Sequence, residues 1–332
     1  MKKILRSIFK KTNSIRNNIF APDWQFRDKL MNLQGVNAAY QVRSIERIET
    51  LSDIEFSVSS QWGEDGIIEW LVYHNGDMPE TFVEFGVESY REANTRFLLT
   101  QRNWKGLVID GSRPNIEFIK EDAVSWRHDL TSVCAFITAE NINSIVEDAG
   151  FRDEIGILSI DIDGNDYWVW KAINIVKPHF VVAEYNSVLG DARPLSVPYD
   201  PSFSRTAAHH SNLYYGASIS ALYHLADARG YAVLGSNRAG NNVFFVRHDR
   251  LHKFEDRIRN RSPRPSRFRE GREPNYAMSF VRGVDRATVI QNCIAEDVTT
   301  SERRPLKDFM PIYSDMWLRA IENGDRVQSK NQ

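Results

Sequence analysis

Cysteine is scarce in this chain of 332 residues, which contains only Cys134 and Cys293. Two cysteines so far apart exclude a disulfide framework, and they lack the clustered spacing of a zinc site. Long apolar runs are also missing: no stretch reaches the ~18 residues of a membrane-spanning helix, and charges interrupt the apolar start too often for a signal peptide. These absences predict a protein of the reducing cytoplasm.

Neither sign of charge dominates the chain, whose formal net charge of −2 argues against a nucleic-acid partner. Acids are nonetheless missing from residues 1–20, which carry six basic side chains: Lys2, Lys3, Arg6, Lys10, Lys11 and Arg16. On a helix, the apolar side chains of this segment would share the face opposite the lysines: Ile4, Leu5, Ile8 and Phe9. The pattern predicts either peripheral contact with the anionic inner surface of a membrane or a solvated basic tail.

Strand and helix patterns alternate over residues 56–250, which predicts a mostly parallel sheet with helices on both faces. Four apolar strands in this region each lead to a carboxylate at the edge where ligands bind: Glu84, Asp110, Asp161 and Glu184. The strand patterns at 231–234 and 242–247 have only a turn-rich link between them, so we expect an antiparallel last strand. Residues 1–55 are predicted to form an N-terminal extension, and residues 251–332 a C-terminal elaboration.

The loop after the first of these strands is poor in glycine and reads Gly86-Val87-Glu88-Ser89-Tyr90-Arg91. It lacks the later glycines of a dinucleotide-binding loop and has an acid where a pyrophosphate would need room, which argues against NAD. Glu84 before Gly86, and Asp110 at the end of the next strand, are spaced as in nucleoside sites. There the glycine lets the ligand approach, and the second acid accepts hydrogen bonds from ribose hydroxyls.

Three ordered motifs resemble the opening of FkbM-type S-adenosylmethionine-dependent methyltransferases: Ser60–Asp65, Phe82–Gly86 and the stretch from Asn94 to Asp110. The resemblance extends over residues 60–247. It implies the class I methyltransferase fold, a Rossmann-like three-layer α/β sandwich, with S-adenosylmethionine as the cofactor. The implied activity is O-methylation of a sugar or glycan precursor, so the expected partner is a small-molecule or glycan acceptor.

By this resemblance, six residues would contact or border the cofactor: Gln61, Glu84, Gly86, Asn94, Asp110 and Asp129. Asp110 would hold the ribose hydroxyls, and Asp129 would lie near the adenine. Structural roles explain three of the six as well, because Gln61 and Asn94 are candidates for helix caps and Asp129 for a turn residue.

Three acids follow the strand at 157–161 closely, namely Asp161, Asp163 and Asp166. In a methyltransferase, Asp161 would lie beside the transferred methyl group. Asp163 and Glu184 would bind Mg²⁺ or Mn²⁺, as in related metal-dependent sugar O-methyltransferases. Two of these acids also have possible structural roles that involve no catalysis or ligand, because Asp163 could form a turn and Asp166 could cap the next helix. The Asp-x-Asp pair also matches metal-dependent glycosyltransferases, an alternative that leaves the two nucleoside-site acids without a role.

His209 and His210 are the candidates for a base that takes the acceptor's proton, because imidazole titrates near neutrality. Solvated loop histidines are the alternative. The arginine-rich segment 257–272 is either a solvated loop or a clamp for the phosphates of an anionic substrate. A non-catalytic binding protein of the methyltransferase fold is the remaining alternative to an enzyme.

Overall fold

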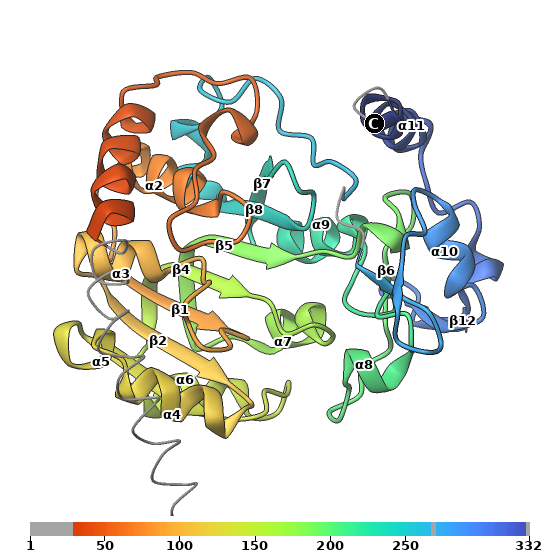
Figure 1. Ribbon diagram of the computed structural model, residues 1–332, viewed down its shortest axis with the longest axis horizontal. Helices are drawn as coiled ribbons and strands as arrows, with labels where there is room; N and C mark the ends of the chain where they lie inside the picture. The colour runs from red at the N-terminus through yellow and green to blue at the C-terminus, as the bar shows by residue number, and fades with distance from the viewer. Residues whose placement is uncertain (1–28, 267–269, 330–332) are drawn as a thin grey trace, which may run out of the picture.

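The computed structural model describes residues 29–266 and 270–329, and a seven-stranded sheet forms its centre (Figure 1). The strands of this sheet are β1 (Thr81–Phe85), β2 (Lys105–Asp110), β3 (Leu130–Cys134), β4 (Asp153–Ile160), β5 (Val176–Glu184), β7 (Tyr231–Ser236) and β8 (Asn242–Arg247). Their order is β3-β2-β1-β4-β5-β8-β7. The pairs from β3 to β5 are parallel, and β8 runs antiparallel to both of its neighbours. This is the class I methyltransferase topology, so the predicted fold class with its antiparallel last strand is confirmed.

Helices cover both faces of the sheet because successive side chains of a strand point to opposite faces. Val83 and Phe85 of β1 join one apolar core with α6, α7 and α9, whereas Phe82 joins the other core with α2, α3, α4 and α5. These helices are α2 (Glu64–Asn75), α3 (Arg96–Arg102), α4 (Arg113–Glu121), α5 (Val124–Arg127), α6 (Ile142–Asp148), α7 (Asp166–Ala172) and α9 (Ile219–Ala228). The result is the predicted sandwich of three layers.

A second, three-stranded antiparallel sheet lies beside the carboxyl edge of the main sheet (Figure 1). It consists of β6 (Leu195–Ser196), β11 (Ile294–Asp297) and β12 (Glu302–Pro305). Its strands come from both sides of residue 250, so the segment predicted as a C-terminal elaboration shares a sheet with the central region. The same part of the fold has its own core, which includes Leu195, Leu213 and Phe309.

The remaining elements are short, apart from the last helix. They are α8 (Arg205–Ala208), α10 (Asp285–Val289), α11 (Asp315–Ser329), β9 (Gly271–Arg272), β10 (Met278–Ser279) and the 3-10 helices η1 (Leu51–Ile54), η2 (Ser187–Leu189), η3 (His248–Lys253) and η4 (Leu306–Phe309). Of these, α8 and η2 matter most for the site, because both follow the end of β5 and lie at the carboxyl edge of the main sheet.

The arginine-rich segment packs along the chain that follows the helix over residues 29–43. Backbone hydrogen bonds connect Ile48 N to Arg257 O (2.8 Å) and Arg259 N to Ile48 O (3.1 Å). The side chain of Arg257 is paired with Glu46, and that of Arg259 with Glu49 at 3.3 Å. These two arginines therefore pair with carboxylates of the chain that precedes α2.

The basic residues 1–20, with their predicted membrane contact, lie outside the described residues. Within the described part of the chain, no helix combines the length and the apolar character needed to cross a membrane.

Candidate functional site

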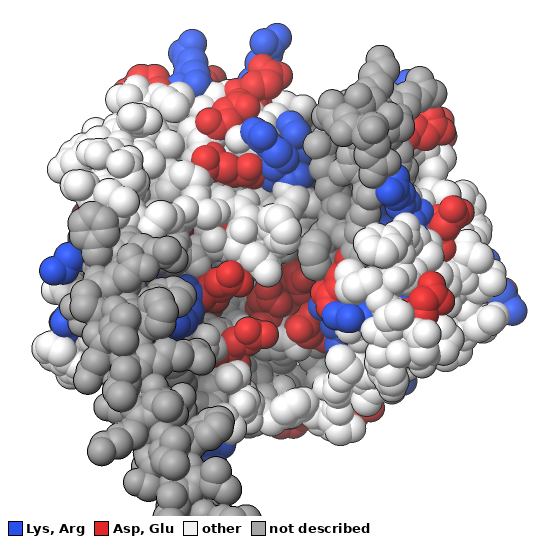
Figure 2. Space-filling view, viewed as in Figure 1, with Lys and Arg blue, Asp and Glu red and all other residues white. Residues whose placement is uncertain are grey.

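A cavity of about 440 Å³ opens at the carboxyl edge of the main sheet, where the ends of β1, β2, β4 and β5 meet. Of the residues that the structure describes, two arginines line it, Arg205 and Arg286, and nine acids: Glu64, Glu84, Glu88, Glu92, Asp110, Asp161, Asp163, Glu184 and Glu270. Figure 2 shows acidic side chains gathered around a hollow in this face of the molecule. The excess of acids favours a positively charged ligand.

Glu84, at the end of β1, is buried and joins that strand to the start of α3. Its Oε1 accepts a hydrogen bond from Asn94 N (2.8 Å), and its Oε2 accepts hydrogen bonds from Thr95 N (3.1 Å) and the Thr95 hydroxyl. Burial raises the pKa of Glu84 to about 7, although these donors favour its charged form. Glu84 thus fixes the backbone at Asn94 and Thr95, which lies beside the cavity.

Gly86 is the point where the loops after β1 and β4 touch. Its φ is +69°, and a Cβ atom built on it would lie 1.7 Å from the backbone oxygen of Asp161. Its N–H also donates to Ile109 O in β2 at 3.0 Å. Only glycine permits both this conformation and this approach, so Gly86 brings three strand ends together.

Asp110, at the end of β2, lines the cavity and orders the loops on both sides of it. It accepts hydrogen bonds from Glu88 N (2.8 Å), Ser112 N (2.7 Å) and Asn115 Nδ2 (3.1 Å). A carboxylate has about four acceptor positions, so one of them is left for a ligand. This arrangement suits a carboxylate that receives one ribose hydroxyl.

Gln61 and Asn94 both line the cavity, as the resemblance implies. The alternative that they cap helices does not hold, because the N-caps of α2 and α3 are Gly63 and Thr95. Asn94 instead donates from Nδ2 to the Ser159 hydroxyl at 3.1 Å, which connects α3 to β4 across the cavity floor.

The structure corrects the assignment of Asp129 to the adenine end of the cofactor site, because Asp129 lies at the opposite edge of the sheet. It directly precedes β3, whose first residue Leu130 pairs with Gly106 near the start of β2. The Asp129 side chain is 65% exposed and lies 3.9 Å from Lys105 Nζ. The sequence did not reveal β3, because this edge strand is only partly buried and carries Thr131 and Ser132 in place of an apolar run.

The acids after β4 divide into two groups. Oxygens of Asp161, Asp166 and Glu184 lie within 4.8 Å of one another. Asp161 and Glu184 are neighbours because Ile160 of β4 pairs with Ala183 of β5. Burial, and then the charges of neighbouring acids, raise the pKa of both Asp161 and Glu184 well above their usual range.

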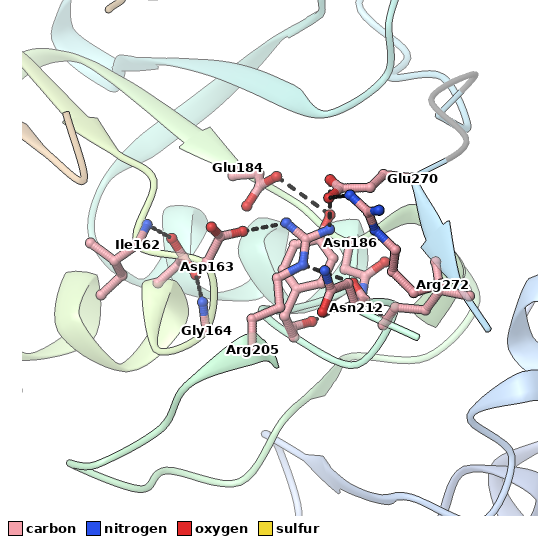
Figure 3. Close-up of polar contacts among 12 residues, drawn as sticks. Ile162, Asp163, Gly164, Glu184, Asn186, Arg205, Asn212, Glu270 and Arg272 are labelled. Carbon is pink, nitrogen blue, oxygen red and sulfur yellow. Dashed lines mark hydrogen bonds and ion pairs between the residues drawn. The ribbon is translucent and has the colours of Figure 1, made fainter. Parts of the chain in front are cut away.

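Asp163 turns away from that group, which corrects the predicted pairing of Asp163 with Glu184 at a metal. Its backbone has a φ of +55°, and its carboxylate is 2.5 Å from Arg205 Nη1 (Figure 3). Asp166 accepts hydrogen bonds from Ile162 N (2.8 Å) and Gly164 N (2.9 Å). Asp166 therefore closes the turn and contributes its oxygens to the group that Asp163 was predicted to join.

Arg205 of α8 is a site residue that the sequence did not indicate. Besides Asp163, it contacts Glu270 (3.5 Å), and its Nε donates to Asn212 O at 2.7 Å. Its guanidinium also lies over the Tyr215 ring, 4.0 Å from the centroid. Figure 3 shows Asp163 and Glu270 approaching Arg205 from opposite sides. These partners are far apart in the chain, so no local pattern marks the residue.

The structure does not bring His209 or His210 to the cavity, which corrects their assignment as candidate bases. Both follow α8, and neither lines the cavity. His209 Nδ1 is 2.8 Å from the Ser211 hydroxyl and accepts a hydrogen bond from Ser211 N (3.2 Å). Burial, and then the proximity of His210, lower the pKa of His209. The histidine pair therefore belongs to the turn that follows Arg205.

No protein-family model and no curated protein matches this chain. Among solved structures, it is similar to an S-adenosylmethionine-dependent methyltransferase from Clostridium acetobutylicum, at 10% identity over 55% of this chain and 90% of that chain (TM-score 0.35). It is also similar to an O-methyltransferase family protein from Burkholderia thailandensis, at 12% identity over 55% of this chain and 58% of that chain (TM-score 0.34). At such identities and TM-scores, the similarity concerns the fold, and nothing about activity follows from it.

Proposed function

We propose that this protein is an S-adenosylmethionine-dependent methyltransferase that methylates an oxygen of a sugar or glycan precursor. The observation that carries the proposal is the acid-lined cavity at the carboxyl edge of a class I sheet, with Gly86 and Asp110 at its wall. Ligands of open α/β sheets bind at this edge. Asp110, with one acceptor position left, would receive a ribose hydroxyl, and the Gly86 loop would lie along the nucleoside.

The charge of the cavity favours this cofactor over a sugar nucleotide. S-adenosylmethionine brings a methyl group on a positively charged sulfur and contains no phosphate. Three of the lining acids, Glu84, Asp161 and Glu184, have raised pKa values, but the other acids among the described lining residues still outnumber the arginines there, which would favour the sulfonium over a nucleoside diphosphate. Asp163, the second acid of the Asp-x-Asp motif, is engaged by Arg205. Both observations disfavour the glycosyltransferase alternative.

The acceptor would enter beside Asp161 and Glu184, where the strand ends meet the second sheet. A hydroxyl held there would donate its hydrogen bond to one of these groups in its deprotonated form. That carboxylate would orient the oxygen lone pair toward the cofactor side and take the hydroxyl proton as the methyl group moves from sulfur to oxygen. Orientation and proximity supply most of the acceleration in such a reaction, so few catalytic groups are needed. Asp161 is the residue that we expect to contact the acceptor oxygen.

Calorimetric titration with S-adenosylhomocysteine tests the proposal. Asp110→Asn should weaken binding roughly ten- to hundredfold, the effect expected for loss of a hydrogen bond to a charged group. Asp129→Asn removes the same charge at the far edge and serves as the matched control, with unchanged affinity. Equal affinity of both variants for S-adenosylhomocysteine would contradict the role of Asp110.

A uridine diphosphate titration discriminates the alternatives. Binding of uridine diphosphate in place of S-adenosylhomocysteine would support the glycosyltransferase instead. A non-catalytic protein of the same fold would bind S-adenosylhomocysteine but form none of it from S-adenosylmethionine in the presence of sugar acceptors.

A further inference from the structure

The helix over residues 29–43 has an apolar face that points to solvent. Leu30, Leu33 and Tyr40 follow one another at spacings of three and seven residues, which places them on one side of a helix. Leu33 is 58% exposed and Tyr40 is 65% exposed. The polar residues that share this side, Asn37 and Gln41, are also exposed and carry no charge. Grouped apolar side chains in contact with solvent are typical of a binding surface.

Contacts on the opposite side of this helix fix which face points outward. Gly35 lies there, and a Cβ atom built on it would be 2.4 Å from Cγ2 of Val58. Val42 is buried in the same core as α2 and α3, and Gln101 Nε2 of α3 donates to Asn32 Oδ1 at 3.1 Å. Figure 1 shows the helix, coloured red, beside α2 and α3, at the other end of the long axis from the second sheet. Packing of the inner side therefore holds the apolar side outward.

A tyrosine of α2 extends this surface. Tyr73 is 51% exposed, and the guanidinium of Arg43 lies 5.1 Å from the centroid of the Tyr40 ring and 6.0 Å from that of the Tyr73 ring. Arg43 is itself held by an ion pair with Glu69 of α2. Tyrosine has an apolar ring and a polar hydroxyl, so it suits the boundary between lipid and water. We call Leu30, Leu33, Tyr40 and Tyr73 together the N-terminal apolar face.

Positive charge is concentrated at the end of the chain that contains most of this face. Residues 1–43 have nine basic side chains and two acids, Asp23 and Asp28. The remaining residues have 33 basic side chains and 42 acids, so the two parts of the chain carry opposite net charge. An anionic surface would attract the first part and repel the second. Charge and apolar exposure thus favour the same side of the protein for contact with such a surface.

We propose that the N-terminal apolar face docks on an anionic phospholipid surface, with the helix over residues 29–43 lying in the plane of the membrane interface. Helices bind membranes in this way when apolar side chains enter the boundary between headgroups and acyl chains while basic residues nearby attract anionic lipids. The helix adds an apolar contact to the electrostatic contact predicted for residues 1–20.

Charge also distinguishes lipid from a second copy of this chain. Pairing of the same face on two chains about a two-fold axis would bring two segments of like charge together. That repulsion opposes a dimer through this face, whereas the same charge favours an anionic lipid surface.

Sedimentation of the full chain with vesicles of phosphatidylserine and phosphatidylcholine tests the surface. The double variant Leu33→Gln/Tyr40→Gln should bind at least tenfold more weakly, because two apolar side chains no longer enter the lipid. Glutamine forms helices about as well as leucine, so the helix is kept. Tyr276→Gln/Phe280→Gln is the matched control, because Tyr276 and Phe280 are similarly exposed, at 68% and 69%, and lie outside the N-terminal apolar face. This control should bind as the unaltered protein does.

Salt separates the helix from the basic residues. Added salt should weaken binding of the unaltered protein, because it screens the basic residues, whereas the loss in Leu33→Gln/Tyr40→Gln should persist at high salt. Unchanged binding in this variant, or an equal loss in the control, would overturn the proposal. Equal binding to vesicles of phosphatidylcholine alone would overturn the choice of an anionic surface.

Two measurements without lipid identify other occupants of the face. A dimer in analytical ultracentrifugation that disappears in Leu33→Gln/Tyr40→Gln would assign the face to a second copy. A lower melting temperature in this variant, with none in the control, would assign it to contacts within the chain. Either result would overturn the proposal, and neither depends on the cofactor, so the S-adenosylhomocysteine titration is read separately.

Discussion

Replacement of Gly86 by alanine should lower the free energy of unfolding by more than the strain of the left-handed backbone at this position costs by itself. A residue other than glycine at a φ of +69° costs about 1–2 kcal/mol. The new Cβ would also lie 1.7 Å from Asp161 O, a backbone atom that cannot rotate away. Overpacking of this kind costs typically about 1–3 kcal/mol, so we expect a total loss of about 2–5 kcal/mol in the free energy of unfolding.

Gly150→Ala separates the two contributions. Gly150 has a φ of +82°, and a Cβ atom built on it meets nothing within 4 Å, so this control experiences only the conformational cost. Urea unfolding of both variants should show Gly86→Ala to be the less stable by about 1–3 kcal/mol, the overpacking cost. S-adenosylhomocysteine binding should weaken in Gly86→Ala alone, because the loops after β1 and β4 must separate. Equal stability and equal binding in the two variants would refute the assigned close approach.

Three further predictions concern charge. The raised pKa of Glu84, about 7 against the usual 4.5, means that the folded chain keeps a proton which the unfolded chain releases. The stability that this proton contributes is complete below pH 4.5 and is lost as the pH rises through 7, by up to about 3 kcal/mol. In urea unfolding, the stability of Glu84→Gln should therefore depend less on pH than that of the unaltered protein. Arg205→Gln removes the ionic partner of Asp163 and Glu270 and the guanidinium over the Tyr215 ring, so the free energy of unfolding should fall by about 1–3 kcal/mol; unchanged stability in urea unfolding would contradict this. Basic residues near an anionic membrane contribute ~1 kcal/mol each, so a chain that begins at Pro22 should lose the salt-sensitive binding to phosphatidylserine vesicles that we expect of the full chain. Equal sedimentation of both chains would exclude residues 1–20 as the anchor.

Sequence by itself determined the strands of the main sheet other than β3, and the acids at their carboxyl ends. Short apolar runs that lead to carboxylates are local features, and they specify which residue stands at the end of each of these strands. The short link between β7 and β8 excludes a crossover, so the antiparallel β8 follows from chain length alone. Glu84, Gly86, Asp110, Asp161 and Glu184 could be placed at one edge on these grounds.

Only the tertiary structure decided which of these groups meet. Asp163 and Asp166 both follow the end of β4 within a few residues, and Asp163 is the nearer of the two. A left-handed backbone at Asp163 directs its carboxylate to Arg205, 42 residues away, and two turn N–H groups hold Asp166 toward Glu184. Asp129 was misplaced because the half-buried edge strand after it has no clear apolar pattern. Local patterns specify strand ends, whereas the partners of a loop side chain depend on distant segments that only packing brings near.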